Sequence, residues 1–91
     1  RKAVKLRPNF TDILTKIGTT LREKGDMDQA IETFTKAKEA SPKYVPVYIH
    51  LGMTYYSQGR QDLAVQEWKA AQKIDPANRA VQVYLNLVKK P

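Results

Sequence analysis

The sequence predicts an all-α solenoid of antiparallel helix pairs, and two regularities carry this prediction. Proline recurs at positions 8, 42 and 76, so both intervals are 34 residues long. Residues 11–44 also align with residues 45–78 over their whole length. A fixed period of this kind is typical of proteins that stack helical units and bind other molecules, because one unit cannot bury its apolar face alone.

Identical residues and apolar equivalents recur between the two copies. The identical pairs are Gly18/Gly52, Thr20/Thr54, Gly25/Gly59, Asp28/Asp62, Ala30/Ala64, Ala37/Ala71 and Pro42/Pro76. The apolar pairs are Ile17/Leu51, Leu21/Tyr55, Ile31/Val65, Phe34/Trp68 and Ala40/Ile74. We therefore expect one domain, 1–91, made of the tail of a preceding repeat (1–10), two full repeats (11–44 and 45–78) and a capping helix (79–91).

Start and stop signals place the helices near residues 11–24, 28–41, 45–58, 62–74 and 79–90, after a short helical stub at 1–7. Each of the three regularly spaced prolines is expected to stop the helix before it, because proline cannot continue a helix. Gly25 and Gly59 suit the left-handed residue just past a helix. Asp28 and Asp62 then fall in a first turn, where the helix dipole favours a carboxylate.

Glycine inside a helix needs a packing reason, since it costs roughly 1 kcal/mol relative to alanine. Gly18 and Gly52 lie inside predicted helices. We expect the small residues Ala30 and Ala64 to face them across a close helix pair, with Phe34 or Trp68 filling the space beside the contact.

The last helix differs from the others in its polar face. Gln82, Asn86 and Lys89 stand where a packing face would hold large apolar side chains, whereas Val81, Leu85 and Val88 keep the face toward the previous repeat apolar. This pattern predicts a terminal cap, with missing repeats upstream, and the alternative is a degenerate internal repeat. The chain begins inside a repeat, so we also expect it to be a piece of a longer protein, with Val4, Leu6, Ile13 and Leu14 incompletely covered.

The repeat resembles the tetratricopeptide repeat. The first copy reads Leu14-x-x-Ile17-Gly18-x-x-Leu21 followed by Ala30, Phe34, Ala37 and Pro42, and the second reads Tyr48-x-x-Leu51-Gly52-x-x-Tyr55 followed by Ala64, Trp68, Ala71 and Pro76. The resemblance implies a right-handed superhelix of helix pairs that presents a concave groove to protein ligands.

In this family the first helix of each repeat lines the groove. The resemblance places there Asp12, Thr15, Lys16, Thr19, Arg22 and Glu23, then Ile49, His50, Met53, Tyr56 and Ser57, and finally Val83, Tyr84, Leu87 and Lys90. The groove is then polar at its N-terminal end and apolar toward the cap. An apolar strip is expected to mark the partner site, or alternatively its side chains partly bury one another: Ile49, Met53, Tyr56, Val83, Tyr84 and Leu87.

Family members that grip a C-terminal carboxylate use a set of lysine, asparagine and arginine side chains in the groove. By resemblance those slots here hold Thr15, Thr19, His50, Ala80 and Tyr84, none of which matches. The sequence therefore does not favour a carboxylate clamp.

Composition argues against several other functions. The net charge is +7, but Arg1, Lys2, Lys5, Arg7, Lys89 and Lys90 carry six of the sixteen positive charges, which leaves ten against nine acids elsewhere. A nucleic-acid site would show a continuous basic stripe instead. Cysteine is absent, and the single histidine, His50, has no ligand-type residue at i±3 or i±4, so no metal or other cofactor is expected.

The sequence thus predicts a protein–protein interaction module and no enzyme. A peptide or partner helix would be anchored by the apolar strip and oriented by Lys16, Arg22 and His50. The alternative is a structural scaffold that self-associates through the apolar strip or the repeat-stacking face.

Overall fold

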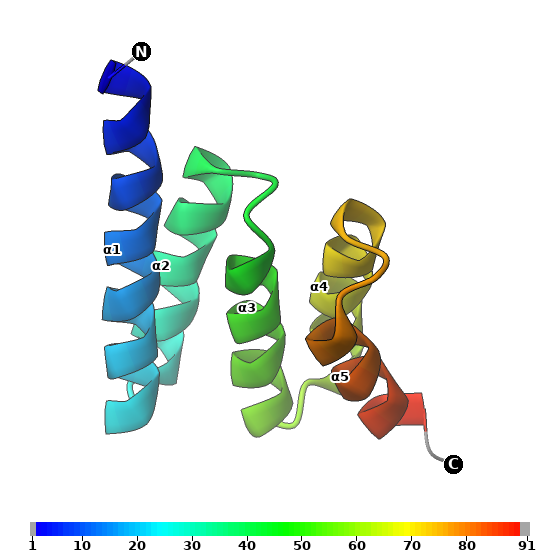
Figure 1. The fold of residues 1–91 in the computed structure, drawn as a ribbon. Helices are drawn as coiled ribbons and strands as arrows, with labels where there is room; N and C mark the ends of the chain where they lie inside the picture. The colour runs from blue at the N-terminus through cyan, green and yellow to red at the C-terminus, as the bar shows by residue number, and fades with distance from the viewer. Residues whose placement is uncertain (1, 90–91) are drawn as a thin grey trace.

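The structure, a computed structural model, describes residues 2–89, and the side chains of residues 10–88. Within this range it contains five helices and no strand, which confirms the predicted all-α fold class. The helices are α1 (Lys2–Lys24), α2 (Met27–Ala40), α3 (Val45–Ser57), α4 (Gln61–Ile74) and α5 (Arg79–Lys89). Each helix reverses the direction of the one before it, so α1, α3 and α5 run one way and α2 and α4 the other (Figure 1). Lys90 and the side chains of Val4, Leu6 and Lys89 lie outside the described part.

The predicted break at Pro8 is wrong. The stub at 1–7 and the helix at 11–24 form one continuous helix, α1, whose first turns project beyond the ends of α2 and α3 (Figure 1). A proline inside a helix removes one backbone hydrogen bond and costs about 3 kcal/mol. The residues around Pro8 nevertheless continue as helix, so the local stop signal does not decide the path of the chain here.

The other helix ends follow the sequence signals. Gly25 and Gly59 have φ angles of 94° and 82°, in the left-handed region that glycine favours. The residue after Gly25, Asp26, donates its backbone N–H to the carbonyl of Leu21 at 2.9 Å, which closes the end of α1. Pro42 and Pro76 lie in the connections after α2 and α4, as expected of a residue that cannot extend a helix.

The interior consists of two core clusters, each shared between neighbouring helix pairs. The first core cluster contains Ala30, Phe34, Ala37, Val47 and Leu51. The second core cluster contains Tyr48, Ala64, Trp68, Ala71 and Val81. Because each cluster joins the second helix of one repeat to the first helix of the next, the repeats form one continuous body.

The two helical glycines make room for aromatic rings and not for the alanines that the sequence suggested. A Cβ atom on Gly18 would lie 2.5 Å from Cε1 of Phe34, and one on Gly52 would collide with the indole of Trp68. The absence of a side chain at Gly52 also lets the indole Nε1–H reach the backbone carbonyl of Ile49, at 3.3 Å. Each helical glycine therefore leaves the space that the aromatic ring of the following helix occupies.

The α5 helix has one buried side and one exposed side, as its sequence predicts. Val81 is fully buried and Leu85 and Val88 are half-buried, whereas Gln82 and Asn86 are exposed. The side chain of Asn78 starts the helix, since its Oδ1 accepts the backbone N–H of Val81 at 3.1 Å and so satisfies a donor of the first turn.

We predict that Gly52→Ala destabilises the domain although alanine is the better helix former. The added methyl displaces the buried Trp68 ring, and overpacking typically costs 1–3 kcal/mol against a gain of about 1 kcal/mol in helix propensity. A net loss of up to about 2 kcal/mol lowers the Tm of a domain this size by up to roughly 16 °C, which thermal unfolding followed by circular dichroism measures.

Thr20→Ala is the control, because Thr20 is exposed on the neighbouring helix α1 and the change should leave the stability within about 0.5 kcal/mol of the parent value. A Gly52→Ala variant that melts above the parent would contradict the close approach of Trp68.

Candidate functional site

The face formed by α1, α3 and α5 carries the residues that the sequence assigns to partner binding. These helices run in the same direction, so positions one repeat apart occupy equivalent places on successive helices (Figure 1). We call this surface the groove face. Its predicted binding residues are Thr15, Lys16, Thr19 and Arg22 on α1, Ile49, His50, Met53 and Tyr56 on α3, and Val83, Tyr84 and Leu87 on α5.

Between α1 and α3 the groove face contains an open hollow of about 510 Å³. Its lining is polar and carries both signs of charge, from Asp12, Lys16 and Glu23. At one end the hydroxyl of Tyr44 donates to Oδ1 of Asp12 at 3.4 Å. Burial and the Asp12 carboxylate both raise the pKa of Tyr44, so the hydroxyl keeps its proton and remains a donor.

Two threonines of the groove face hydrogen-bond to their own helix. The hydroxyl of Thr15 donates to the carbonyl of Thr11 at 2.8 Å, and that of Thr19 donates to the carbonyl of Thr15 at 2.9 Å. Thr15 is only 7% exposed. Thr15 lines the hollow between α1 and α3, but it offers a ligand little polar surface, because it is nearly buried and its hydroxyl already donates within α1.

His50 is held by an aromatic contact. Its ring stacks on that of Phe34 with the centroids 5.5 Å apart and the planes 7° from parallel. The buried Nδ1 has no hydrogen-bond partner among the described residues. Burial lowers the pKa of His50, and the positive charge of Arg22 lowers it further, so the ring is neutral at pH 7. A neutral stacked imidazole contributes shape to the groove face and no charge.

Arg22 links α1 to α3. Its Nη1 lies 3.9 Å from the sulfur of Met53, and both side chains are half-buried. The Arg22 guanidinium therefore lies against Met53 while it brings a positive charge to the groove face. Lys16 is exposed and lines the hollow, so a ligand can reach its charge directly.

Toward α5 the groove face becomes aromatic. The ring of Tyr84 stacks on Trp68 with the centroids 5.1 Å apart, and the ring of Tyr56 meets Trp68 at 6.0 Å in a tilted arrangement. Trp68 itself is 1% exposed and belongs to α4. A buried indole thus supports two tyrosines that reach the surface, which fixes their positions through packing.

The structure divides the predicted apolar strip into two groups. Ile49, Met53 and Tyr84 are half-buried and pack against the second core cluster, so they belong to the packing between helices as well as to the surface. The other three are open to solvent: Tyr56 is 36%, Leu87 44% and Val83 59% exposed. We call these three the exposed triad.

Sequence reasoning missed the aromatic stacks that join one repeat to the next. Phe34 with His50 and Trp68 with Tyr84 are the same contact repeated, because both members of the second pair lie one repeat later in the chain than those of the first. The signal was present in the alignment as a planar side chain at 50 and 84. The alignment alone could not reveal the contact, because the local sequence does not indicate against which helix such a ring packs.

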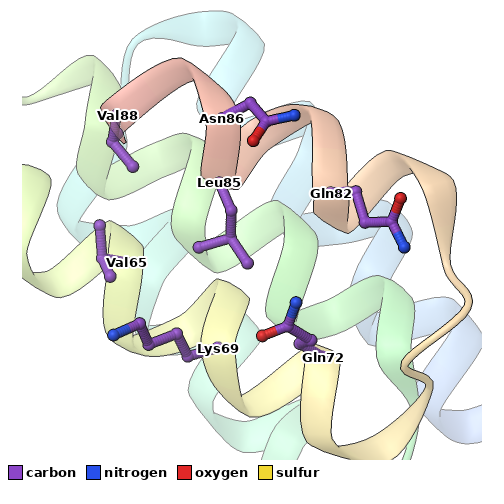
Figure 2. Close-up of a pocket in the computed structure, with 7 residues that line it drawn as sticks. All are labelled: Val65, Lys69, Gln72, Gln82, Leu85, Asn86 and Val88. Carbon is purple, nitrogen blue, oxygen red and sulfur yellow. The ribbon is translucent and has the colours of Figure 1, made fainter. Parts of the chain in front are cut away.

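A second hollow, of about 590 Å³, lies between α4 and α5 (Figure 2). Val65, Leu85 and Val88 form its apolar floor, and the polar chains of Gln72, Gln82 and Asn86 surround it. Lys69 is the one charged residue in this lining, and none of the lining residues has an orphaned buried polar atom.

The geometry defines a class of protein, the stacked helical repeat whose first helices form a common binding face. A family model described as tetratricopeptide repeat matches residues 21–87, which is most of the chain. The chain belongs to the tetratricopeptide repeat family, whose members act as protein–protein interaction modules. No curated protein matches the chain. Among the described residues, no helix is long and apolar enough to cross a membrane and no three His, Cys, Asp or Glu side chains could together hold a metal ion.

We predict that acidification weakens the domain through His50. Because its folded pKa lies below the ordinary value of about 6.5, the unfolded chain takes up the proton first as the pH falls. The stabilising contribution is therefore complete above about pH 6.5 and is lost as the pH falls toward the folded pKa. Each unit of pKa depression corresponds to about 1.4 kcal/mol at most.

Thermal unfolding at pH 7.5 and 5.5 measures this effect, with His50→Tyr as the matched variant because Tyr84 fills the equivalent place in the next repeat. The parent should lose Tm between these pH values and the variant should lose less. Equal losses would mean that His50 is not the group that titrates.

Proposed function

We propose that this chain binds a peptide or a partner helix on the groove face, with the exposed triad as the apolar anchor. The exposure of Val83 and Leu87 carries this proposal. They lie four residues apart on α5 and therefore on one side of it, whereas Val81 is buried on the inward side of the same helix. Apolar side chains grouped outside the core and beside rigid aromatic rings are typical of an interaction site.

Rigidity supports the triad as an anchor. Tyr56 and Tyr84 are both held against Trp68, and Val83 adjoins Tyr84 in the chain, so a ligand meets a surface that is already ordered. A preformed surface loses little side-chain entropy on binding, so more of the free energy gained by burying apolar area contributes to the affinity.

The polar end of the groove face would orient the ligand. Lys16 is exposed, Arg22 is half-buried beside Met53, and Asp12 and Glu23 lie in the same hollow as Lys16. Such mixed charges favour one direction of the bound segment over the reverse and add little raw affinity.

Val83→Glu combined with Leu87→Glu should abolish binding without unfolding the domain. Peptides are first selected against the parent from displayed libraries of extended and helical sequences, and their affinities are then measured by fluorescence polarisation. Loss of a central anchor costs about 2 kcal/mol or more, about thirtyfold in affinity. Both positions are exposed, so the Tm should change little.

The matched control is Gln82→Glu with Asn86→Glu, which adds the same charge to the same helix at exposed positions outside the triad. This control should bind within about threefold of the parent, or ~0.6 kcal/mol. Parental binding by the triad variant would contradict the proposal. A parent that sediments as an oligomer and becomes monomeric only in the triad variant would instead support the self-associating scaffold.

Lys16→Glu tests the orienting charge separately. For a selected ligand with an acidic residue, affinity should fall by less than tenfold in low salt, because an exposed ion pair contributes about 0.2–1 kcal/mol. The difference from the parent should shrink at about 0.5 M salt, where exposed charges are screened. A salt-independent loss would show that Lys16 acts through packing and not through its charge.

A further inference from the structure

The middle of the groove face carries a thioether sulfur. Met53 lies on α3, with α1 on one side and α5 on the other (Figure 1), and its counterparts one repeat away are Thr19 and Leu87. Its side chain is half-buried, because part of it packs against the second core cluster and the rest remains open to solvent. Met53 therefore lies where the polar part of the groove face meets the apolar part that contains Leu87.

The sulfur of Met53 is next to a strong hydrogen-bond donor. Nη1 of Arg22 lies 3.9 Å from Sδ of Met53. A thioether sulfur is only a weak acceptor, so the contact contributes little while the sulfur is reduced. The guanidinium has several N–H donors and keeps its charge at any physiological pH. A permanent charged donor thus lies beside an atom that uses it poorly.

Oxidation of the sulfur would change this balance. Methionine sulfoxide is a polar side chain, and its new oxygen needs a hydrogen-bond donor. Without a donor, a polar group on a half-buried side chain destabilises the folded state, because it has lost its hydrogen bonds to water. At Met53 the Arg22 guanidinium can donate to that oxygen, and hydrogen bonds from a charged donor are the stronger kind. The fold can therefore hold the oxidised side chain at a small cost in stability.

Met53 differs in this respect from the other methionine. The chain has two methionines and no cysteine. Met27 is the first residue of α2, away from the groove face, and among the described residues no hydrogen-bond donor contacts its sulfur. Met53 is therefore the thioether whose oxidation would alter the groove face.

We propose that Met53 is a reversible oxidation site that regulates ligand binding on the groove face, an inference that rests on the proposed function. In the reduced chain the thioether adds to the apolar surface beside the exposed triad. In the oxidised chain the sulfoxide makes this part of the surface polar and pairs with Arg22, so a ligand with an apolar anchor binds more weakly.

The oxidant is a peroxide. A lone pair of the Met53 sulfur attacks one oxygen of hydrogen peroxide, the O–O bond breaks and an S–O bond forms. The attacked oxygen passes its proton to the departing hydroxide, which leaves as water. Sulfur loses two electrons and the peroxide gains them. Methionine sulfoxide reductases reverse the step with electrons from a thiol, and the oxygen then leaves as water.

The first experiment needs no ligand. Met27→Leu leaves Met53 as the one thioether, and hydrogen peroxide should then add one oxygen atom to the chain, which intact-mass spectrometry detects. Oxidation should lower the Tm of this variant only slightly. When Arg22→Leu is added, oxidation should lower the Tm by at least about 4 °C more, because the sulfoxide oxygen then lacks its charged donor. A chain that takes up no oxygen, or equal losses of Tm in the two variants, would overturn the assignment of this site.

The second experiment measures binding after the peroxide has been removed. The probe is a peptide without Met or Cys, selected against the reduced parent from the displayed libraries. Oxidised Met27→Leu should bind it at least about fivefold more weakly than the reduced form does. Both classes of methionine sulfoxide reductase, supplied with dithiothreitol, should restore the affinity. The chain has no cysteine, so the thiol itself leaves it unchanged.

The matched control is Met27→Leu with Met53→Leu, which removes the sulfur and keeps an apolar side chain of similar volume. Its affinity should be the same before and after peroxide treatment. An unchanged affinity of the chain oxidised at Met53, or an equal loss in the control, contradicts the regulatory role.

The exposed triad is tested separately, because the variant Val83→Glu with Leu87→Glu is measured in the reduced chain. A peptide that binds the reduced parent, is lost in that variant and is indifferent to oxidation refutes this inference and leaves the proposed function in place. If no selected peptide binds the reduced parent, the proposed function fails and the regulatory role fails with it, whereas the stability experiment still decides whether Arg22 holds the sulfoxide.

Discussion

The close approach of an aromatic ring to a helical glycine is the constraint on which the rest of the structure depends. Phe34 over Gly18 and Trp68 over Gly52 fix the distance between the two helices of each repeat. Each ring also stacks on a side chain from the first helix of the next repeat, which is His50 for Phe34 and Tyr84 for Trp68. One planar side chain thus sets both the packing within a repeat and the packing between repeats, so the array propagates by a single repeated contact.

This arrangement explains why polar and apolar surface is unevenly distributed over the groove face. Near α1, several donors are already used within the domain: the hydroxyls of Thr15 and Thr19 bond to their own helix, and Arg22 lies against Met53. Near α5 the buried Trp68 supports tyrosines that reach solvent. Apolar surface therefore remains available where the packing beneath it is firmest, and such a surface can bind without first being ordered.

The cohesion between repeats also limits where apolar residues stay exposed. Lys38 joins three helices, because its ammonium lies 3.2 Å from the Glu67 carboxylate and 5.4 Å from the centre of the Tyr48 ring. Within the array, the apolar side of a repeat's first helix packs against the second helix of a repeat. The exposed large apolar side chains lie mainly on α1 and α5, the first and last helices of the described chain (Figure 1). A stack of helix pairs buries its apolar faces in this way because each unit packs only against its neighbours.

The sequence by itself determined the repeat, the order of the helices and most of their ends, because glycine and proline act through local backbone geometry. Gly25 and Gly59 are left-handed and Pro42 and Pro76 lie outside helices, as their residue types dictate. Only the tertiary structure decided the outcome at Pro8, where the chain continues as one helix from Lys2 to Lys24. The tertiary structure also decided which groove residues are open, since the exposure of a side chain depends on the helix packed against it and not on its own identity.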